Sequence, residues 1–138
     1  MTGGNDECEK FFFKAKKKDN GEWVEGCLVI DQSRPDIFKY RIQPIKSGVL
    51  YAAPINPDTL CQYTGLTDKN GNKIWENDIV DTFEESSKEF LRNVVKFEDG
   101  CFKVFKKHYL SMHMDSYEKT DLKVVGNIFD NPDLLEVE

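Results

Sequence analysis

Glycine turns set between runs of aromatic and β-branched residues constrain this chain more than any other feature. Three such turns are present, at Asn20-Gly21, Asn70-Gly71 and Asp99-Gly100. Asn-Gly and Asp-Gly favour the positive φ angles of tight hairpin turns, and the residues on either side favour extended backbone. We therefore predict three β-hairpins around these turns, with Gly26 marking a bulge in the return arm of the first.

The rest of the chain predicts further short strands and little helix. Residues 37–45 alternate apolar and polar side chains, which predicts a strand, and residues 47–55 and 121–129 predict two more. Residues 83–93 hold good helix formers after an acidic start, so they predict either a short helix or a mobile insert. Residues 106–120 have no clear period and predict a loop followed by an edge strand.

The end of the chain carries a helix-start pattern. In DNPDLL, Asn131 can cap a terminal helical turn with Pro132 at its first position. Many short strands with tight turns predict a mainly β fold, with SH3-like small barrels built from Asn-Gly hairpins and short helical segments. The chain is either a single domain over 1–138 or two coupled lobes, a β-hairpin lobe at 8–60 and an SH3-like barrel lobe at 61–138. Segments 25–29 and 76–80 align as a weak internal repeat of one hairpin plan.

Composition places the chain among soluble globular proteins. Of its 138 residues, 39% are hydrophobic, 12% aromatic and 32% charged. No apolar run reaches the length of about 20 residues that spans a bilayer, and the start MTGGNDECEK lacks the basic and apolar regions of a secretory signal. We expect a cytoplasmic protein with no membrane partner.

Cysteine and histidine spacing predicts neither a metal site nor a redox motif. The cysteines, far apart and without a CxxC pair, are Cys8, Cys27, Cys61 and Cys101. His108 and His113 are five residues apart, a spacing that puts them on one face of neither a helix nor a strand. We predict reduced, mostly buried thiols, no metal and no cofactor.

Charge is unevenly distributed along the chain. Residues 1–64 hold nine Lys and Arg against nine Asp and Glu, whereas residues 65–138 hold ten against sixteen, so the net charge of −6 arises in the second half. Two basic clusters remain: Lys14, Lys16, Lys17 and Lys18, and later Lys103, Lys106 and Lys107. They either contact a nucleic-acid backbone, with Phe102 or Tyr109 stacking on bases, or are solvated strand faces and a hairpin edge guarded by lysine; we prefer the second interpretation.

The stretch TGLTDKNGNKIWENDIV, residues 64–80, carries most of the candidate chemistry. Asp68, Glu76, Asp78 and, just beyond it, Asp81 would form a carboxylate cluster for Mg²⁺ or for acid and base catalysis. Neighbouring residues on a strand point to opposite faces, so we prefer a structural role for these groups. Asp68 and Asn70 then serve turn chemistry, while Glu76 and Asp78 satisfy backbone donors at a strand start.

Sharper site signatures are missing from the sequence. Asp68, Asn70 and Asn72 resemble the start of a calcium loop, but the glycine comes too early and no Glu closes the loop. Thr64 has no GxSxG elbow around it, and no phosphate-binding loop is present. We therefore expect no enzymatic activity.

Two substitutions in the same stretch test the structural interpretation. Gly71→Val should damage folding, while Asp78→Ala should change the free energy of unfolding by less than about 1 kcal/mol if Asp78 is exposed.

Three segments carry a resemblance to a known family: KAKKKDNGEWVEGCLV at 14–29, QYTGLTDKNGNKIWENDIV at 62–80 and VVGNIFDNPDLLE at 124–136. In this order they resemble the YopX family, small proteins found mostly in bacteriophages, prophages and gut-bacterial mobile elements. The chain departs from the family at Asn77, where members usually carry Gly. The motif positions that match are Gln62, Tyr63, Thr64, Gly65, Leu66, Asp68, Asn70, Gly71, Ile74, Glu76, Asp78, Ile79, Val80, Gly126, Asn127, Asn131 and Pro132.

The resemblance implies a mainly β fold with SH3-like barrel character, assembly into oligomers and a bacterial host cell, and it brings no established activity. We prefer a phage- or mobile-element-encoded accessory protein without enzymatic activity, which binds an unknown protein partner or itself through a β surface. The alternative is a nucleic-acid-binding module, and a third hypothesis is a small hydrolase that uses Asp78 or Asp81.

Overall fold

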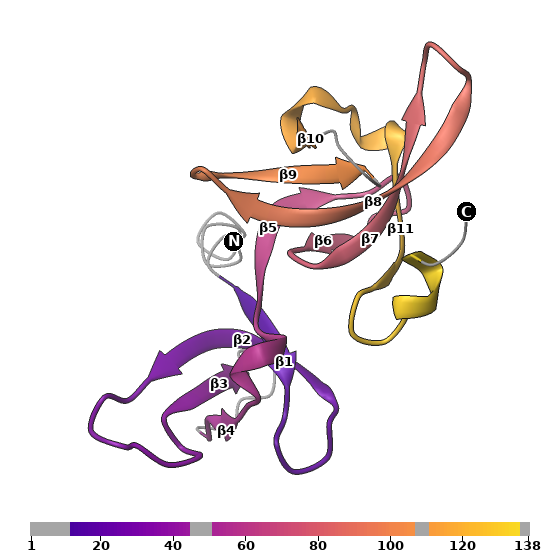
Figure 1. Cartoon of the computed structure of the whole chain (residues 1–138). Helices are drawn as coiled ribbons and strands as arrows, with labels where there is room; N and C mark the ends of the chain where they lie inside the picture. The colour runs from indigo at the N-terminus through magenta and orange to yellow at the C-terminus, as the bar shows by residue number, and fades with distance from the viewer. Residues whose placement is uncertain (1–11, 45–50, 107–110, 136–138) are drawn as a thin grey trace. The chain divides into compact units, whose positions relative to one another are not determined.

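The computed structural model describes residues 12–44, 51–106 and 111–135. The chain divides into two compact units, residues 1–63 and 64–138. Figure 1 shows their strands, which form two sheets. The structure confirms the mainly β class. The SH3-like barrel character stays a prediction, because the strand orders in the described part of the chain are those of open sheets.

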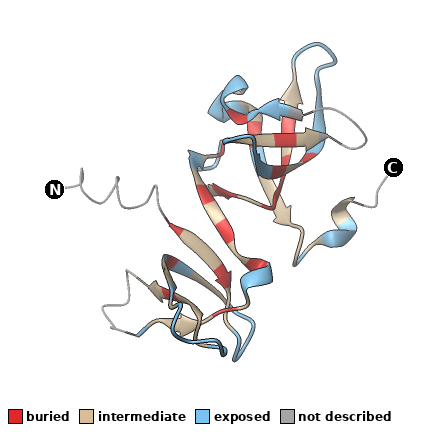
Figure 2. Cartoon of the chain, turned by 60° about the vertical axis from the view of Figure 1, so that its left-hand side comes forward, coloured by how far each residue is buried: buried red, intermediate tan, exposed pale blue. Residues whose placement is uncertain are grey.

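The first unit is an antiparallel sheet around a small core. Its elements are β1 (Phe13–Lys16), β2 (Trp23–Ile30), β3 (Tyr40–Pro44), β4 (Ala53–Pro54), the 3-10 turn η1 (Pro57–Thr59) and the start of β5 (Cys61–Thr67). The strand order is β4-β3-β2-β1-β5-β6, where β6 (Lys73–Trp75) belongs to the second unit. Ala15, Ile42 and Ile55 are fully buried at the centre of the first unit. Figure 2 shows the buried residues of the chain in red.

The first predicted hairpin is confirmed, but its glycine in the return arm has another role. The Gly21 N–H donates to the Lys17 carbonyl oxygen (2.9 Å), and Gly21 has a φ of +74°. Gly26 makes no bulge, because its pairing with β1 and β3 runs in continuous register. A Cβ at Gly26 would lie 2.1 Å from the Gln43 carbonyl oxygen, so glycine is required there for close approach of β3.

The second unit contains a five-stranded antiparallel sheet, and its described part also forms three 3-10 turns. Its sheet elements are β7 (Asp78–Glu84), β8 (Glu89–Glu98), β9 (Cys101–Lys106), β10 (Ser111–His113) and β11 (Leu122–Asn127), in the order β10-β9-β8-β7-β11. The turns are η2 (Met114–Ser116), η3 (Lys119–Asp121) and η4 (Pro132–Leu135). The buried core residues are Ile74, Val80, Val95, Val104, Met114 and Leu122. β10 is the edge strand predicted within 106–120, and β11 confirms the last strand.

Residues 83–93 form neither of the predicted alternatives. They make the end of β7, a turn and the start of β8, with Phe83 opposite Phe90 and Thr82 opposite Leu91. The Lys88 N–H donates to the Glu84 carbonyl oxygen (2.8 Å), and Lys88 has a φ of +58° at the turn. Cross-strand pairing has overridden the helix propensity of Glu, Lys and Leu. We call residues 83–91 the hairpin arm; Figure 1 shows it projecting beyond the rest of its sheet.

Three smaller expectations are corrected. The strand expected at 37–45 begins only at Tyr40, because the Asp36 carboxylate accepts the Phe38 N–H (3.0 Å) and holds a turn before it. Of the strand expected at 47–55, residues 45–50 lie outside the described residues, and β4 covers Ala53–Pro54. The internal repeat is not structural, since 25–29 lies within β2 while 76–80 contains a turn and the start of β7.

Candidate functional site

Asp68 stabilises the Asn70-Gly71 turn and links it by a hydrogen bond to β11. Its Oδ1 accepts the N–H groups of Asn70 (2.9 Å) and Asn72 (2.8 Å), and its Oδ2 accepts the Val124 N–H (2.9 Å). The residue is fully buried. Burial by itself would raise the pKa of Asp68, but hydrogen bonds from Val124, Asn72 and Asn70 to the carboxylate outweigh it and hold the pKa below its usual value. The predicted turn chemistry of Asp68 is therefore confirmed.

The other carboxylates of the central stretch are engaged separately. Asp78 is 3% exposed and its Oδ2 accepts the Trp75 N–H (2.8 Å), so it does satisfy a backbone donor, but it is buried, contrary to the exposure considered above. Asp81 forms an ion pair with Arg92 (3.0 Å), and that hydrogen bond raises the pKa of Arg92. Within the described ranges, no group of three or more His, Cys, Asp or Glu side chains is arranged to hold a metal ion. Asp68, Asp78 and Asp81 are thus not gathered into a metal-binding cluster, and their use in acid and base catalysis stays a hypothesis.

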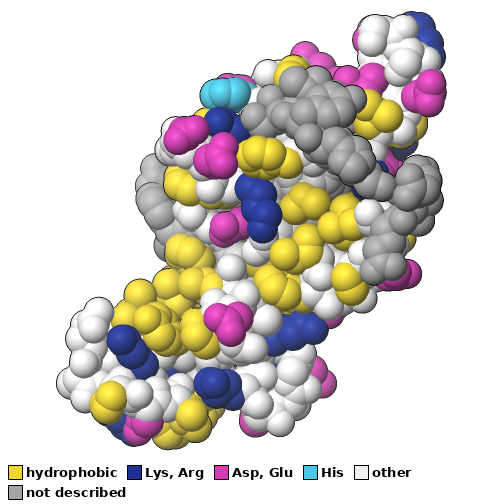
Figure 3. Space-filling model, viewed as in Figure 1, with side chains coloured by type: hydrophobic (Ala, Val, Ile, Leu, Met, Phe, Trp, Pro, Cys, Tyr) yellow, Lys and Arg dark blue, Asp and Glu magenta, His cyan; other side chains and the backbone are white. Residues whose placement is uncertain are grey.

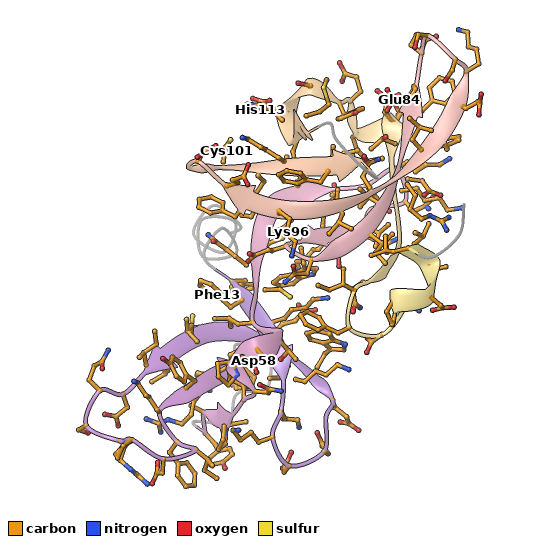
Figure 4. The ribbon with its side chains drawn as sticks, viewed as in Figure 1. Phe13, Asp58, Glu84, Lys96, Cys101 and His113 are labelled. Atoms are coloured by element: carbon orange, nitrogen blue, oxygen red, sulfur yellow. The ribbon has the colours of Figure 1, made fainter. Side chains whose placement is uncertain are left out.

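Asn77, at the position where the resemblance implies a glycine, has the backbone conformation that favours glycine. Its φ is +73°, and its N–H donates to the Val95 carbonyl oxygen (2.8 Å). The Lys96 Nζ donates to Asn77 Oδ1 (2.8 Å), a contact that glycine could not make. Figure 4 labels Lys96 on β8. Asparagine is among the residues that tolerate positive φ best, so the departure from the family is absorbed locally.

Other motif positions also build the fold. The Thr64 hydroxyl donates to the Ile74 carbonyl oxygen (2.7 Å) and accepts the Leu66 N–H (3.1 Å), which gives it a structural role in β5. Gly65 has a φ of +85°, a conformation that L side chains rarely adopt. At the end of the chain, Asn131 Oδ1 accepts the Asn127 N–H (3.1 Å). Pro132 begins η4 as predicted, but the Asn131 side chain is turned back to β11.

The first basic cluster gathers around an aromatic ring. The Nζ atoms of Lys14 and Lys16 lie 4.6 Å and 5.5 Å from the centroid of the Trp23 ring. Lys16 is paired with Trp23 and Lys14 with Glu25 across β1 and β2, so these side chains share the face opposite the core residue Ala15. Figure 3 shows basic and hydrophobic side chains near one another on the visible face of this unit. The predicted solvated strand face is thus also a lysine and tryptophan surface.

The second basic cluster is not an open positive surface in the part that the structure describes. The Lys103 Nζ lies 3.3 Å from Asp99 and 3.6 Å from Glu98, and its side chain is 12% exposed. Lys107 and Tyr109 lie outside the described residues. Phe102 is partly buried against the core of the second unit and lies edge-on to Phe97. Its stacking on a base stays a prediction.

The hairpin arm exposes apolar side chains that the sequence did not single out. The rings of Phe83 and Phe90 lie 5.2 Å apart, and Phe90 is 48% exposed. Leu91 is 38% exposed on the opposite face of the strand. The Lys69 Nζ lies 5.8 Å from the Phe90 ring. The signal was the near symmetry of Phe-Glu-Glu at 83–85 and Lys-Glu-Phe at 88–90 about Ser86-Ser87, which fits a hairpin as well as a helix.

The cysteines also depart from expectation. Cys61 is buried, but Cys27 is exposed and Cys101 is half-buried, and Cys8 lies outside the described residues. The prediction of mostly buried thiols is wrong for two of the three described cysteines. Both lie on strand faces directed away from the core of their sheet, where the sequence offered only alternation as a guide.

Comparison with known proteins assigns the family. The model of the YopX protein family matches residues 12–136. The chain belongs to the YopX family. The structure of YopX from Bacillus subtilis is similar with a TM-score of 0.61 and 18% identity, covering 94% of this chain and 99% of that one. Protein EF1440 from Enterococcus faecalis is similar with a TM-score of 0.54 and 23% identity, covering 89% of this chain and 96% of that one. No curated protein matches this YopX-family chain.

These two likenesses show a shared fold over almost the whole length of each chain. At 18% and 23% identity they establish the fold alone. Among the described residues of this YopX-family chain, no helix is long and apolar enough to cross a membrane. A functional assignment must therefore come from surfaces on this chain, of which the hairpin arm and the lysine and tryptophan face are the strongest.

Proposed function

We propose that this YopX-family chain is a phage- or mobile-element-encoded accessory protein without enzymatic activity, which acts by binding another protein through the hairpin arm. The observation that carries the proposal is the exposure of Phe90 (48%) and Leu91 (38%) at neighbouring positions of a paired strand. Exposed apolar side chains gathered on one projecting element mark interaction surfaces more often than scattered single ones do.

The geometry of the arm supports a partner that grips it from both sides. Phe90 and Leu91 point to opposite faces of β8, and the pairing of Phe83 with Phe90 keeps the ring on a fixed strand position. Aromatic anchors of this kind carry much of the energy of protein interfaces when a pocket on the partner encloses them. The arm is thus suited to insertion into an apolar groove.

Charge supports a partner with a basic rim. Residues 84–89 contain three Glu and one Lys, and Figure 3 shows acidic side chains on the projecting part of the second unit. Residues 65–138 hold ten Lys and Arg against sixteen Asp and Glu, so a second copy of this unit would bring like charge to the arm. Electrostatic complementarity favours a different, basic protein over self-association.

The test compares two matched variants in the full chain. Phe90→Ser with Leu91→Ser removes the anchors, and Ile37→Ser removes an apolar side chain of the first unit that is 52% exposed. We expect a basic host protein captured by the wild type to be retained by Ile37→Ser and lost by the double variant, with unchanged melting temperatures and with nuclease present. Equal retention by the double variant would refute the arm as the binding surface. Light scattering decides the alternative: a dimer lost only in the double variant would assign the arm to a second copy.

A second candidate function, binding of single-stranded nucleic acid, is favoured by the two lysine ammonium groups beside Trp23. Stacking aromatics with flanking cations are typical of such surfaces. The acidic balance of residues 65–138 opposes phosphate and places this candidate second. Anisotropy of a labelled oligonucleotide should show affinity that falls steeply between about 50 and 200 mM salt and falls further in Lys14→Gln with Lys16→Gln. Lys39→Gln is the control, and absence of binding at low salt would reject the candidate.

A further inference from the structure

A cysteine and a histidine meet on the second sheet, outside the hairpin arm. Cys101 begins β9 directly after the Asp99-Gly100 turn, and His113 ends β10. His113 is paired with Lys103, two residues along β9 from Cys101, so the three side chains share one face of the sheet. The Cys101 Sγ lies 3.6 Å from His113 Nδ1. Figure 4 labels both side chains near this end of β9.

The pair is accessible from solvent. Cys101 is half-buried and His113 is exposed, and Figure 3 shows a histidine at the surface beside basic and acidic side chains. Cys27 is also exposed, but on a strand of the other sheet, where Gln43 is its cross-strand neighbour. The chain therefore contains an internal reference thiol with a different environment.

Lys103 places an ammonium group on the same face, together with the carboxylates of Asp99 and Glu98 that pair with it. Burial opposes the charged form of Lys103, but its hydrogen bond to Asp99 and attraction to Asp99, Glu98 and the Cys101 sulfur outweigh it and raise the pKa of the amine. The ammonium is thus held in place, where it attracts negative charge that develops on the sulfur. Partly exposed cysteines beside cationic side chains are the kind that react.

The proton of the thiol has two acceptors within reach. Sγ lies 3.6 Å from the Glu98 carbonyl oxygen and 3.6 Å from His113 Nδ1. In the tautomer with the proton on Nδ1, the imidazole donates to the sulfur while the thiol donates to the Glu98 carbonyl oxygen. In the tautomer with Nδ1 unprotonated, the thiol can donate to Nδ1, which then accepts its proton. Once the proton has moved, the imidazolium remains hydrogen-bonded to the thiolate. This is the arrangement of a nucleophile with an adjacent base.

We propose that Cys101 is a modification site for low-molecular-weight disulfides, with His113 as the base. Cys101 Sγ attacks one sulfur of the disulfide, the disulfide bond breaks, and a mixed disulfide forms on the protein. The thiol proton passes to His113 Nδ1 and from there to the leaving thiolate. One thiol and one disulfide are consumed and one mixed disulfide and one thiol are formed, so the disulfide itself is the oxidant.

Glutathione disulfide is the probe for the test, applied to the full native chain with peptide-resolved mass spectrometry of every cysteine. We expect Cys101 to be modified about tenfold faster than Cys27, and His113→Gln to bring the Cys101 rate close to that of Cys27. The rate of Cys101 against pH should also lose one inflection in His113→Gln. His108→Gln, which changes the chain's other histidine, should leave both rates unchanged.

The outcomes separate a base from a structural residue. A Cys101 rate no higher than the Cys27 rate, or a rate unchanged in His113→Gln, overturns the proposal. If His113→Gln lowers the melting temperature, His113→Asn is measured as well. If both variants unfold, the ratio of the Cys101 rate to the Cys27 rate in the wild type decides alone. In urea the two thiols should react at equal rates, since the advantage belongs to the folded sheet.

Discussion

Gly126 and Asn131 fit together with no space for a side chain between them. A Cβ on Gly126 would lie 2.5 Å from Asn131 Oδ1 and 2.8 Å from its Cγ, and that Oδ1 accepts the Asn127 N–H (3.1 Å). The register of β11 against β7 shifts between Val124 and Gly126, so the strand bends where the asparagine packs. The relationship explains why a glycine and an asparagine stand five residues apart in the terminal motif.

Gly126→Ala should therefore destabilise the protein by about 1–3 kcal/mol through overpacking. Asn131→Ala removes the Oδ1 and Cγ atoms that give the two shortest contacts, together with one hydrogen bond, and keeps only the Cβ at 3.0 Å. The double variant should therefore be more stable than the sum of the two single changes indicates. Urea denaturation of the four proteins measures this coupling. Additive losses would show that the two residues act independently.

The buried Asp68 carboxylate should give the protein a specific acid sensitivity. Hydrogen bonds from backbone N–H groups hold the pKa of Asp68 below its usual value of 3.8 despite burial, which opposes them. A lowered pKa in the folded state contributes stability that is present above the unfolded value and is lost as pH falls through that value toward the folded one. The window for this loss thus lies below about pH 4.

Asp68→Asn should lower the free energy of unfolding by about 1–3 kcal/mol at pH 7, because an amide satisfies the three backbone donors less well. The difference from wild type should shrink at pH 3, where the unfolded wild-type chain takes up a proton at Asp68 that the folded state disfavours. Asp31 and Asp36 in the first unit also have lowered pKa values, so the comparison must be between variant and wild type at each pH. Urea titrations at both pH values measure it, and an equal difference at both would contradict the role of ionisation.

Local turn chemistry made the hairpins predictable, although not their detailed geometry. Asp99 and Gly100 have φ values of +55° and +81°, which is the tight turn that the dipeptide indicates. At Asn70-Gly71, glycine has the positive φ of +82°, and Asp68 closes a wider loop with Asn72. The carboxylate of Asp68 made that difference, and its effect on the turn type is not visible in the dipeptide alone.

The sequence did not predict which residues far apart along the chain would pair. Residues 83–93 carry good helix formers, and only their contacts with β7 make them a strand and turn. The role of Asp68 in its turn followed from nearby residues, but its bond to Val124, 56 residues away, did not. Cys101 and His113 were missed for the same reason, since spacing rules for one helix or strand say nothing about neighbours on paired strands.

The burial of Asp78 reverses the expectation of a mild substitution. Asp78→Ala leaves the Trp75 N–H, now 2.8 Å from Asp78 Oδ2, without its acceptor in a site that is 3% exposed. An unsatisfied buried donor costs about 1–3 kcal/mol, so we expect a clear loss of stability. Glu85→Ala, in a side chain that is 79% exposed, should change stability by less than about 0.5 kcal/mol. Equal small effects in thermal melts would show that Asp78 does not support the β6–β7 turn.

Gly71 tests whether backbone conformation or space limits substitution in the central hairpin. A Cβ there would meet nothing within 4 Å, but the φ of +82° is one that L side chains rarely adopt. Gly71→Val should therefore cost about 1–3 kcal/mol through strain, and Gly71→Asn distinctly less, because asparagine tolerates positive φ best. Thermal and urea denaturation of the two variants give the comparison. If both variants lose the same stability, the dihedral angle does not explain the loss. A contact made by the new side chain would then be the cause, although a Cβ at this position meets nothing within 4 Å.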